Sequence, residues 1–306
     1  MESFPHSSHS PTPATTASTT PPGGLIHLQA RLTNPTMWLV PAWALLCGIA
    51  ASNGFDWQGE HWLRLALLIL LVDGGWGTLW TAMGTTDWAK PLRRWRNWRF
   101  GEPSLTLPYT LPDTPGDRLS LWLGQLRAWW RDILWPSCGS AVSAIIIALP
   151  VTLVLGAILG PELLLLSMAA IAVIEMGLLW AGGRGTVAPI WNGLVSVMLP
   201  WLAGHIGFGP LSPSSAGLAL VLALAWAGAL NVKLSWGCAL GTGGQLLTAV
   251  LLVTLRHPLA AGCVILLLVP QLALLPWVAR GQPSSWHGRH ARLWLMVTMF
   301  VAAVAL

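Results

Sequence analysis

Three ionisable residues stand inside long apolar stretches of the sequence: Asp73, Glu175 and Lys233. A charge at the middle of a membrane costs about 2.5–3.5 kcal/mol on insertion scales, so such a residue normally faces a partner or a water-filled cavity. Two interpretations follow. Lys233 could pair with Asp73 or Glu175 and hold helices together, or the three charges could serve a bound ligand or a transported ion.

Asp73 begins the sequence Asp-Gly-Gly-Trp-Gly at residues 73–77. Its small residues would let another helix or a ligand approach the backbone closely. The chain has 21 tryptophans against one tyrosine, and many of them fall near predicted membrane interfaces, where Trp serves as an anchor. Four others lie within apolar stretches and could form flat walls for a planar or polyene ligand: Trp76, Trp80, Trp180 and Trp226.

Further polar residues follow the Asp73 stretch. Asp87 precedes a basic and aromatic run at residues 93–100, which could bind a diphosphate directly or anchor the loop on anionic lipid. Near a later apolar stretch the polar residues are Asn231, Lys233 and Gln245, without a carboxylate. The ligand-binding candidates are therefore Asp73, Trp76, Trp80, Asp87, Arg93, Arg94, Glu175, Asn231 and Lys233.

Motifs of soluble enzymes are absent from the sequence, which has no Walker A motif, GxSxG, HExxH or dinucleotide-binding fingerprint. The four cysteines are far apart and have no CxxC or CxxH spacing, which favours apolar core thiols over a disulfide or a metal site. The histidines stand at or beyond the ends of apolar stretches, so no pair is expected to face a haem; these are His205, His257, His287 and His290.

The candidate residues belong to a strongly apolar chain, in which 54% of the 306 residues are hydrophobic and 9% are charged. A soluble domain carries about a quarter charged residues. The apolar runs lack the period-two alternation of a barrel, so they predict an all-α polytopic transmembrane bundle embedded in the lipid bilayer. About nine spans are predicted: roughly 37–52, 62–83, 141–159, 163–181, 190–206, 215–238, 243–256, 259–279 and 291–306. The seventh is short and could instead form a broken hairpin with the eighth.

Basic residues predict the orientation of these spans. With nine spans, most Lys and Arg residues lie on the side of the N-terminus, whereas Arg64 and Arg256 fall near the opposite face. This excess places the N-terminus in the cytoplasm. The net charge of +5 is thereby explained by topology and gives no indication of nucleic-acid binding.

Two segments are predicted outside the spans. Residues 1–24 are rich in Ser, Thr and Pro and lack an apolar stretch, so they predict a disordered tail and not a signal peptide, which leaves 25–306 as the bundle. Residues 85–135 form a large cytoplasmic loop. Within it, residues 117–134 have the pattern of an amphipathic helix in the headgroup layer, with one face made by Leu119, Trp122, Leu123, Leu126, Trp130 and Ile133.

The first span and its approach, residues 31–48, begin with Arg31 and Pro35 and carry Gly48 near the end. This opening resembles the first helix of the UbiA-type intramembrane prenyltransferase family. Residues 193–200 in the fifth span are a second stretch that resembles this family. The likeness extends to a plan of nine helices, a cytoplasmic N-terminus and a cytoplasmic loop after helix 2. It implies an isoprenoid-type lipid or pigment as the ligand and magnesium as the cofactor.

The sequence departs from that family in its acidic residues. The family binds magnesium and a prenyl diphosphate through two Asp-rich motifs, because magnesium needs hard oxygen ligands. Near the second predicted span this chain offers Asp87, with Asp73 fourteen positions earlier, and the family's spacing of four residues is missing. No Asp or Glu follows Glu175, so the second acidic motif is absent from this sequence. The sequence therefore predicts a degenerate prenyltransferase that binds its lipid without the usual two-motif chemistry. The alternatives are a non-catalytic subunit or assembly partner of a larger membrane complex, and a transporter that uses the intramembrane charges.

Overall fold

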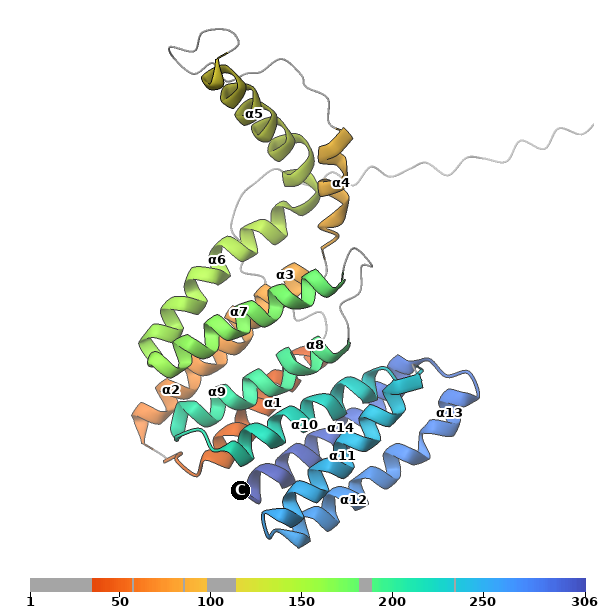
Figure 1. Ribbon diagram of the computed structural model, residues 1–306. Helices are drawn as coiled ribbons and strands as arrows, with labels where there is room; N and C mark the ends of the chain where they lie inside the picture. Colours follow the sequence, from red (N-terminus) through yellow and green to blue (C-terminus); the bar gives the residue numbers. More distant parts are fainter. Residues whose placement is uncertain (1–34, 57, 85, 98–113, 182–188, 234) are drawn as a thin grey trace, which may run out of the picture. The chain divides into compact units, whose positions relative to one another are not determined.

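The structure, a computed structural model, describes residues 35–56, 58–84, 86–97, 114–181, 189–233 and 235–306 (Figure 1). The predicted tail at 1–24 and Arg31 lie outside the described residues. Within these ranges every regular element is helical, and three short π-helical segments (η) interrupt longer helices. The elements are α1 (Pro35–Ser52), α2 (Gly59–Ile69), η1 (Leu70–Gly77), α3 (Thr78–Gly84), α4 (Ala89–Asn97), α5 (Pro115–Trp129), η2 (Trp130–Leu134), α6 (Trp135–Leu159), α7 (Pro161–Ala181), α8 (Pro189–Gly193), η3 (Leu194–Met198), α9 (Leu199–Phe208), α10 (Pro213–Leu230), α11 (Ser235–Thr254), α12 (Pro258–Ala273), α13 (Leu275–Ala279) and α14 (Ser284–Val304).

The predicted membrane bundle is confirmed as an all-α fold. Eight of the nine predicted ranges lie essentially on helices, the sixth runs past the end of α10 into a turn, and α4 is an additional short helix. By length and composition, six of the described helices can cross a membrane: Gly59–Gly84, Pro115–Leu159, Pro161–Trp180, Pro213–Leu230, Trp236–Thr254 and Pro258–Ala279. A seventh apolar helix, Leu39–Ser52, is shorter. The chain is therefore an integral membrane protein of the helical class.

Local sequence signals explain where the helices begin and end. Thr114 and Ser212 accept backbone N–H bonds from Asp117 and Ser215 at the starts of α5 and α10, and a proline follows each cap as the first helical residue. Gly160, with φ of 134°, lies between α6 and α7. That backbone angle suits glycine, so the chain can reverse there within one residue.

The boundary between the sixth and seventh spans was predicted wrongly. The predicted sixth span runs to residue 238, whereas α10 ends at Leu230 and the chain turns at residues 231–233. The side chain of Asn231 donates a hydrogen bond to the carbonyl of Ala227 at 3.0 Å and closes the helix end. Consequently α11 is a full 20-residue helix and not half of a broken hairpin. Lys233 lies exposed in the turn and not within a span.

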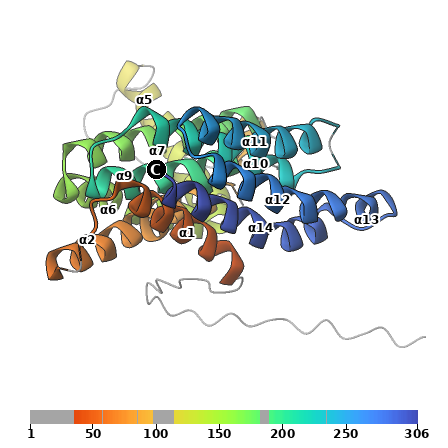
Figure 2. The ribbon, with the colours of Figure 1, turned by 90° about the horizontal axis from the view of Figure 1, so that it is seen from below.

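Glycines allow the close packing of these two helices. A β-carbon on Gly228 of α10 would collide with the backbone of Gly241 in α11, and one on Gly244 would meet Ala225. Small residues at such contacts let membrane helices approach backbone to backbone. The two helices lie side by side in both ribbon views (Figures 1 and 2).

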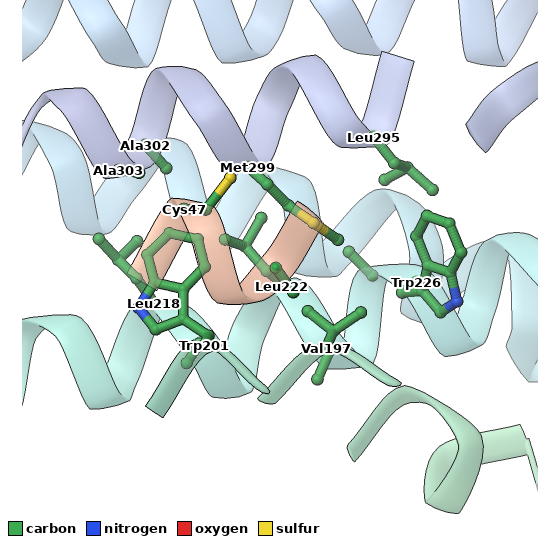
Figure 3. Packing of buried hydrophobic residues seen from close by; sticks show 14 of the residues in the cluster. Cys47, Val197, Trp201, Leu218, Leu222, Trp226, Leu295, Met299, Ala302 and Ala303 are labelled. Atoms are coloured by element: carbon green, nitrogen blue, oxygen red, sulfur yellow. The ribbon is translucent and has the colours of Figure 1, made fainter. Parts of the chain in front are cut away.

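The largest hydrophobic core joins α1, α9, α10 and α14 with parts of α11 and α12 (Figure 3). Trp201 of α9 is fully buried there, and it lies among Cys47, Leu218 and Met299 from three other helices. A second core joins α1 and α9 to α2, η1, α3, α6 and α7. The helices α1 and α9 therefore belong to both cores and connect the two halves of the bundle.

The predicted amphipathic helix is part of a longer one, because α5, η2 and α6 form a continuous 45-residue helix that changes direction near η2 (Figure 1). π-helical segments commonly bend helices. The predicted apolar face is divided: Trp122 and Trp130 are exposed, whereas Ile133 is buried with Trp129. Trp129 donates a hydrogen bond to the carbonyl of Pro91 at 3.2 Å and so fixes α5 to α4. This partner explains why Trp129, and not Trp130, turns inward.

Candidate functional site

The predicted glycine-rich stretch at Asp73 forms the π-helical segment η1 in the middle of a long helix. A π-helical turn is rare and occurs often at functional sites. Within η1 the Asp73 side chain is half-buried, and Gly75 and Trp76 are buried. The structure therefore places three predicted features, a carboxylate, small residues and an aromatic wall, on one irregular segment inside the bundle.

Two buried polar atoms at η1 have no hydrogen-bond partner in the protein: the indole Nε1 of Trp76 and the hydroxyl of Thr152. Thr152 belongs to α6 and is fully buried. It contacts η1 directly, because a β-carbon on Gly75 would lie 2.5 Å from its hydroxyl oxygen. Buried polar groups are nearly always hydrogen-bonded. A donor and a hydroxyl left unpaired on adjoining segments therefore mark this contact as a candidate ligand site.

Aromatic residues extend the site along the same helix. Trp80 lies about one turn beyond Trp76, and a β-carbon on Gly177 of α7 would meet both Trp80 and Trp191 within 3.4 Å. Trp80 packs against the second core. The other two intramembrane tryptophans lie elsewhere, since Trp226 is buried in the first core and Trp180 is 73% exposed on α7.

The remaining acidic candidates do not join this site. Glu175 is exposed on the outer side of α7. Asp87 accepts a hydrogen bond from the backbone N–H of Lys90 at 3.2 Å and so caps the start of α4, where Arg93 and Arg94 are exposed. No group of three or more His, Cys, Asp or Glu side chains able to hold a metal occurs among the described residues.

Asn231 and Lys233 lie together in the turn between α10 and α11. Asn231 is engaged in closing α10, and Lys233 forms no ion pair with Glu175 in the described part of the chain. The three intramembrane charges are thus distributed over η1, the outer side of α7 and a turn.

Sequence reasoning named Gln245 and His287 but missed Gln271 and the contacts among the buried polar residues of the C-terminal half. Gln245 of α11 and Gln271 of α12 hydrogen-bond each other through both amides, at 2.7 and 3.0 Å. His287, at the start of α14, bonds the carbonyl of Ala229 at 3.2 Å. The only signal in the sequence was the presence of two glutamines inside otherwise apolar spans, which are costly there unless they are paired.

Searches for related proteins add no identification. The chain matches no known family, no curated protein and no solved structure.

Proposed function

We propose that this chain binds an isoprenoid-type lipid or pigment within the membrane, on a UbiA-like plan and without two-motif magnesium-diphosphate chemistry. The observations that support it most are two buried polar groups without a partner, the indole N–H of Trp76 in η1 and the hydroxyl of Thr152, whose side chain contacts η1 at Gly75. A buried donor without an acceptor costs about 1–3 kcal/mol. An oxygen at the polar end of a bound lipid would remove that cost.

The surroundings of the two atoms suit the rest of such a ligand. Trp80 and Trp191 provide flat apolar surfaces, and the second core supplies aliphatic side chains around them. Ligand sites are mostly apolar, with a few polar groups that fix orientation. Asp73, half-buried on the same π-helical segment, provides a carboxylate near the polar end of the ligand.

The test is to purify the full chain in mild detergent and to identify co-purified lipids by mass spectrometry. Trp76→Phe keeps the aromatic surface but removes the N–H donor, so we expect at least a tenfold loss of bound isoprenoid lipid. Trp180→Phe is the matched control, because Trp180 is 73% exposed on α7, and it should retain the lipid.

Two results would contradict the proposal. One is the absence of any isoprenoid lipid from the wild-type protein. The other is a Trp76→Phe variant that keeps its lipid and becomes more stable, because the indole N–H would then be an unsatisfied donor with no ligand.

A second candidate function is an assembly partner of a larger membrane complex. It is favoured by the exposed apolar residues Leu119, Trp122 and Trp130 of the α5–η2 segment, which lies in the predicted cytoplasmic loop. Trp122→Ala should release a co-purified protein while leaving bound lipid unchanged. A protein partner retained by that variant would count against this surface.

A further inference from the structure

A small pocket, mostly apolar with a few polar groups in its wall, lies among α10, α11, α12 and α14, and none of its lining residues belongs to η1, α6 or α7. Its volume is about 20 Å³, which is the space of one water molecule or one hydroxyl group. The side chains with hydrogen-bonding capacity in its wall are Cys238, Thr242, Gln245, Gln271 and His287, and Leu268, Leu272 and Leu275 form its apolar side.

The imidazole of His287 is 3% exposed, and its two nitrogens differ in their surroundings. Nδ1 lies 3.2 Å from the carbonyl oxygen of Ala229. A carbonyl only accepts, so Nδ1 carries the proton of this bond, and in the neutral ring Nε2 is a lone-pair acceptor. Nε2 is buried and has no hydrogen-bond partner in the protein. His287, which lines the pocket, therefore has an acceptor nitrogen, Nε2, that no donor of the protein satisfies.

The two glutamines complete the polar wall. Gln271 uses both of its N–H groups, one to Gln245 at 3.0 Å and one to the carbonyl of Leu267 at 3.0 Å. Gln245 donates one N–H to Gln271 at 2.7 Å and keeps the second, because a primary amide has two. The reciprocal pair holds both amides in place, and Gln245 and His287 both line the pocket, so its wall includes one residue with a spare N–H donor and one with a spare acceptor.

We infer that this pocket binds the hydroxyl group of a lipid alcohol. The hydroxyl donates to Nε2 of His287 and accepts from the remaining N–H of Gln245, so it satisfies both groups at once. A carbonyl or an ether can only accept and would leave Nε2 unpaired. The cavity volume admits a group of this size.

Charge excludes an ammonium group as the donor. Lys233 lies in the adjoining turn and Arg289 lies two residues beyond His287, and no Asp or Glu follows Glu175 in the sequence. A positively charged ligand would meet repulsion and no counter-charge.

One residue of the pocket wall is also exposed on the outside of the bundle, where the hydrocarbon part of a ligand would meet lipid. Leu272 lines the pocket and is 39% exposed on α12, a helix long and apolar enough to cross the membrane. The inferred binding mode therefore directs the alkyl chain of the alcohol along this residue toward the bilayer, where it stays in contact with lipid. This outlet favours a lipid alcohol over a water-soluble one.

The experiment uses the full chain in lipid nanodiscs with radiolabelled farnesol, and the methyl ether of farnesol as the analogue without a donor. We expect farnesol to bind at least tenfold more tightly than the ether. In His287→Phe that preference should disappear. His290→Phe is the matched control on the same helix, because His290 is exposed and its Nδ1 bonds the carbonyl of Trp286 at 2.8 Å; it should keep the preference.

A second measurement uses the wild-type protein, so it does not depend on whether a variant folds. In wild-type protein with ¹⁵N-labelled histidine, farnesol should shift the Nε2 resonance of His287 and the ether should not. Equal affinity for alcohol and ether, or an unchanged resonance, would overturn the inference and leave a pocket that holds only water. Trp76→Phe should not alter the alcohol preference, so failure of the η1 site and failure of this pocket are separate results.

Discussion

Gly75 of η1 and Thr152 of α6 are in direct contact, since a β-carbon on residue 75 would lie 2.5 Å from the threonine hydroxyl oxygen. Side chains cannot approach that closely, so only glycine lets these two segments pack as they do. The contact lies within the π-helical segment, directly before Trp76, whose indole N–H has no partner in the protein.

Gly75→Ala should therefore destabilise the protein by about 1–3 kcal/mol through overpacking, measured by reversible unfolding in mixed micelles. The matched control is Gly262→Ala in α12, where a β-carbon meets nothing within 4 Å and the better helix former should be neutral or stabilising. The double variant Gly75→Ala/Thr152→Ala removes the colliding hydroxyl and should recover part of the loss. Equal effects of the two single glycine variants would refute the packing argument.

A chain of hydrogen bonds in the first core gives a second prediction. Trp201 Nε1 donates to the Ser215 hydroxyl at 2.9 Å, which donates to His205 Nδ1 at 3.2 Å. His205 Nε2 donates in turn to the carbonyl of Pro210 at 3.0 Å. Ser215→Ala breaks two of these bonds and leaves a buried indole donor unpaired, so we expect a loss of about 1–3 kcal/mol in the free energy of unfolding.

Ser214→Ala is the control for that experiment. Its hydroxyl lies 3.2 Å from the hydroxyl of Ser212 and is not part of the chain, so its loss should change stability by less than about 0.5 kcal/mol. If both serine variants lose the same free energy of unfolding, the series of hydrogen bonds from Trp201 to Pro210 does not act as a connected unit.

Composition and apolar runs predicted the fold class and a helix within each of the nine predicted ranges, because burial in a membrane leaves few ways to satisfy the backbone. They could not locate the break at Asn231, since apolar residues continue on both sides of it and a local side-chain cap decides the helix end. The pairing of His287 with Ala229 spans 58 residues, and no pattern in one sequence encodes such a contact. The contact of η1 with α6 at Gly75 and Thr152 joins residues 77 positions apart, so Asp73 and Trp76 could be singled out from the sequence but Thr152 could not.

Orientation is the third prediction. From the excess of basic residues at one end we predict that α4 lies in the cytoplasm and the C-terminus outside. An impermeant maleimide applied to intact cells should label Leu306→Cys, whereas Arg94→Cys should react only after the membrane is opened. The wild-type chain, with its four cysteines, gives the background signal. Labelling of both positions from the same side would contradict the odd number of crossings.

The last prediction concerns magnesium. Asp87 caps α4 through its bond to the N–H of Lys90, and no carboxylate follows Glu175 in the sequence to supply a second acidic motif. We therefore expect purified protein to bind a prenyl diphosphate equally well in magnesium and in EDTA, and to release no pyrophosphate when aromatic acceptors are added. The reason is that apolar packing holds the tail of a lipid, whereas magnesium-assisted chemistry needs several hard oxygen ligands.

Asp87→Ala should lower helix stability by about 0.5–2 kcal/mol, as the loss of an N-cap does, and leave lipid binding unchanged. The matched control is Asp132→Ala, because Asp132 is exposed and pairs with the adjacent Arg131 at 2.8 Å. Magnesium-dependent turnover that disappears in Asp87→Ala but persists in Asp132→Ala would mean that one acidic site suffices for catalysis. Asp87 would then be a metal ligand in addition to a helix cap, and the non-catalytic part of the proposal would be wrong.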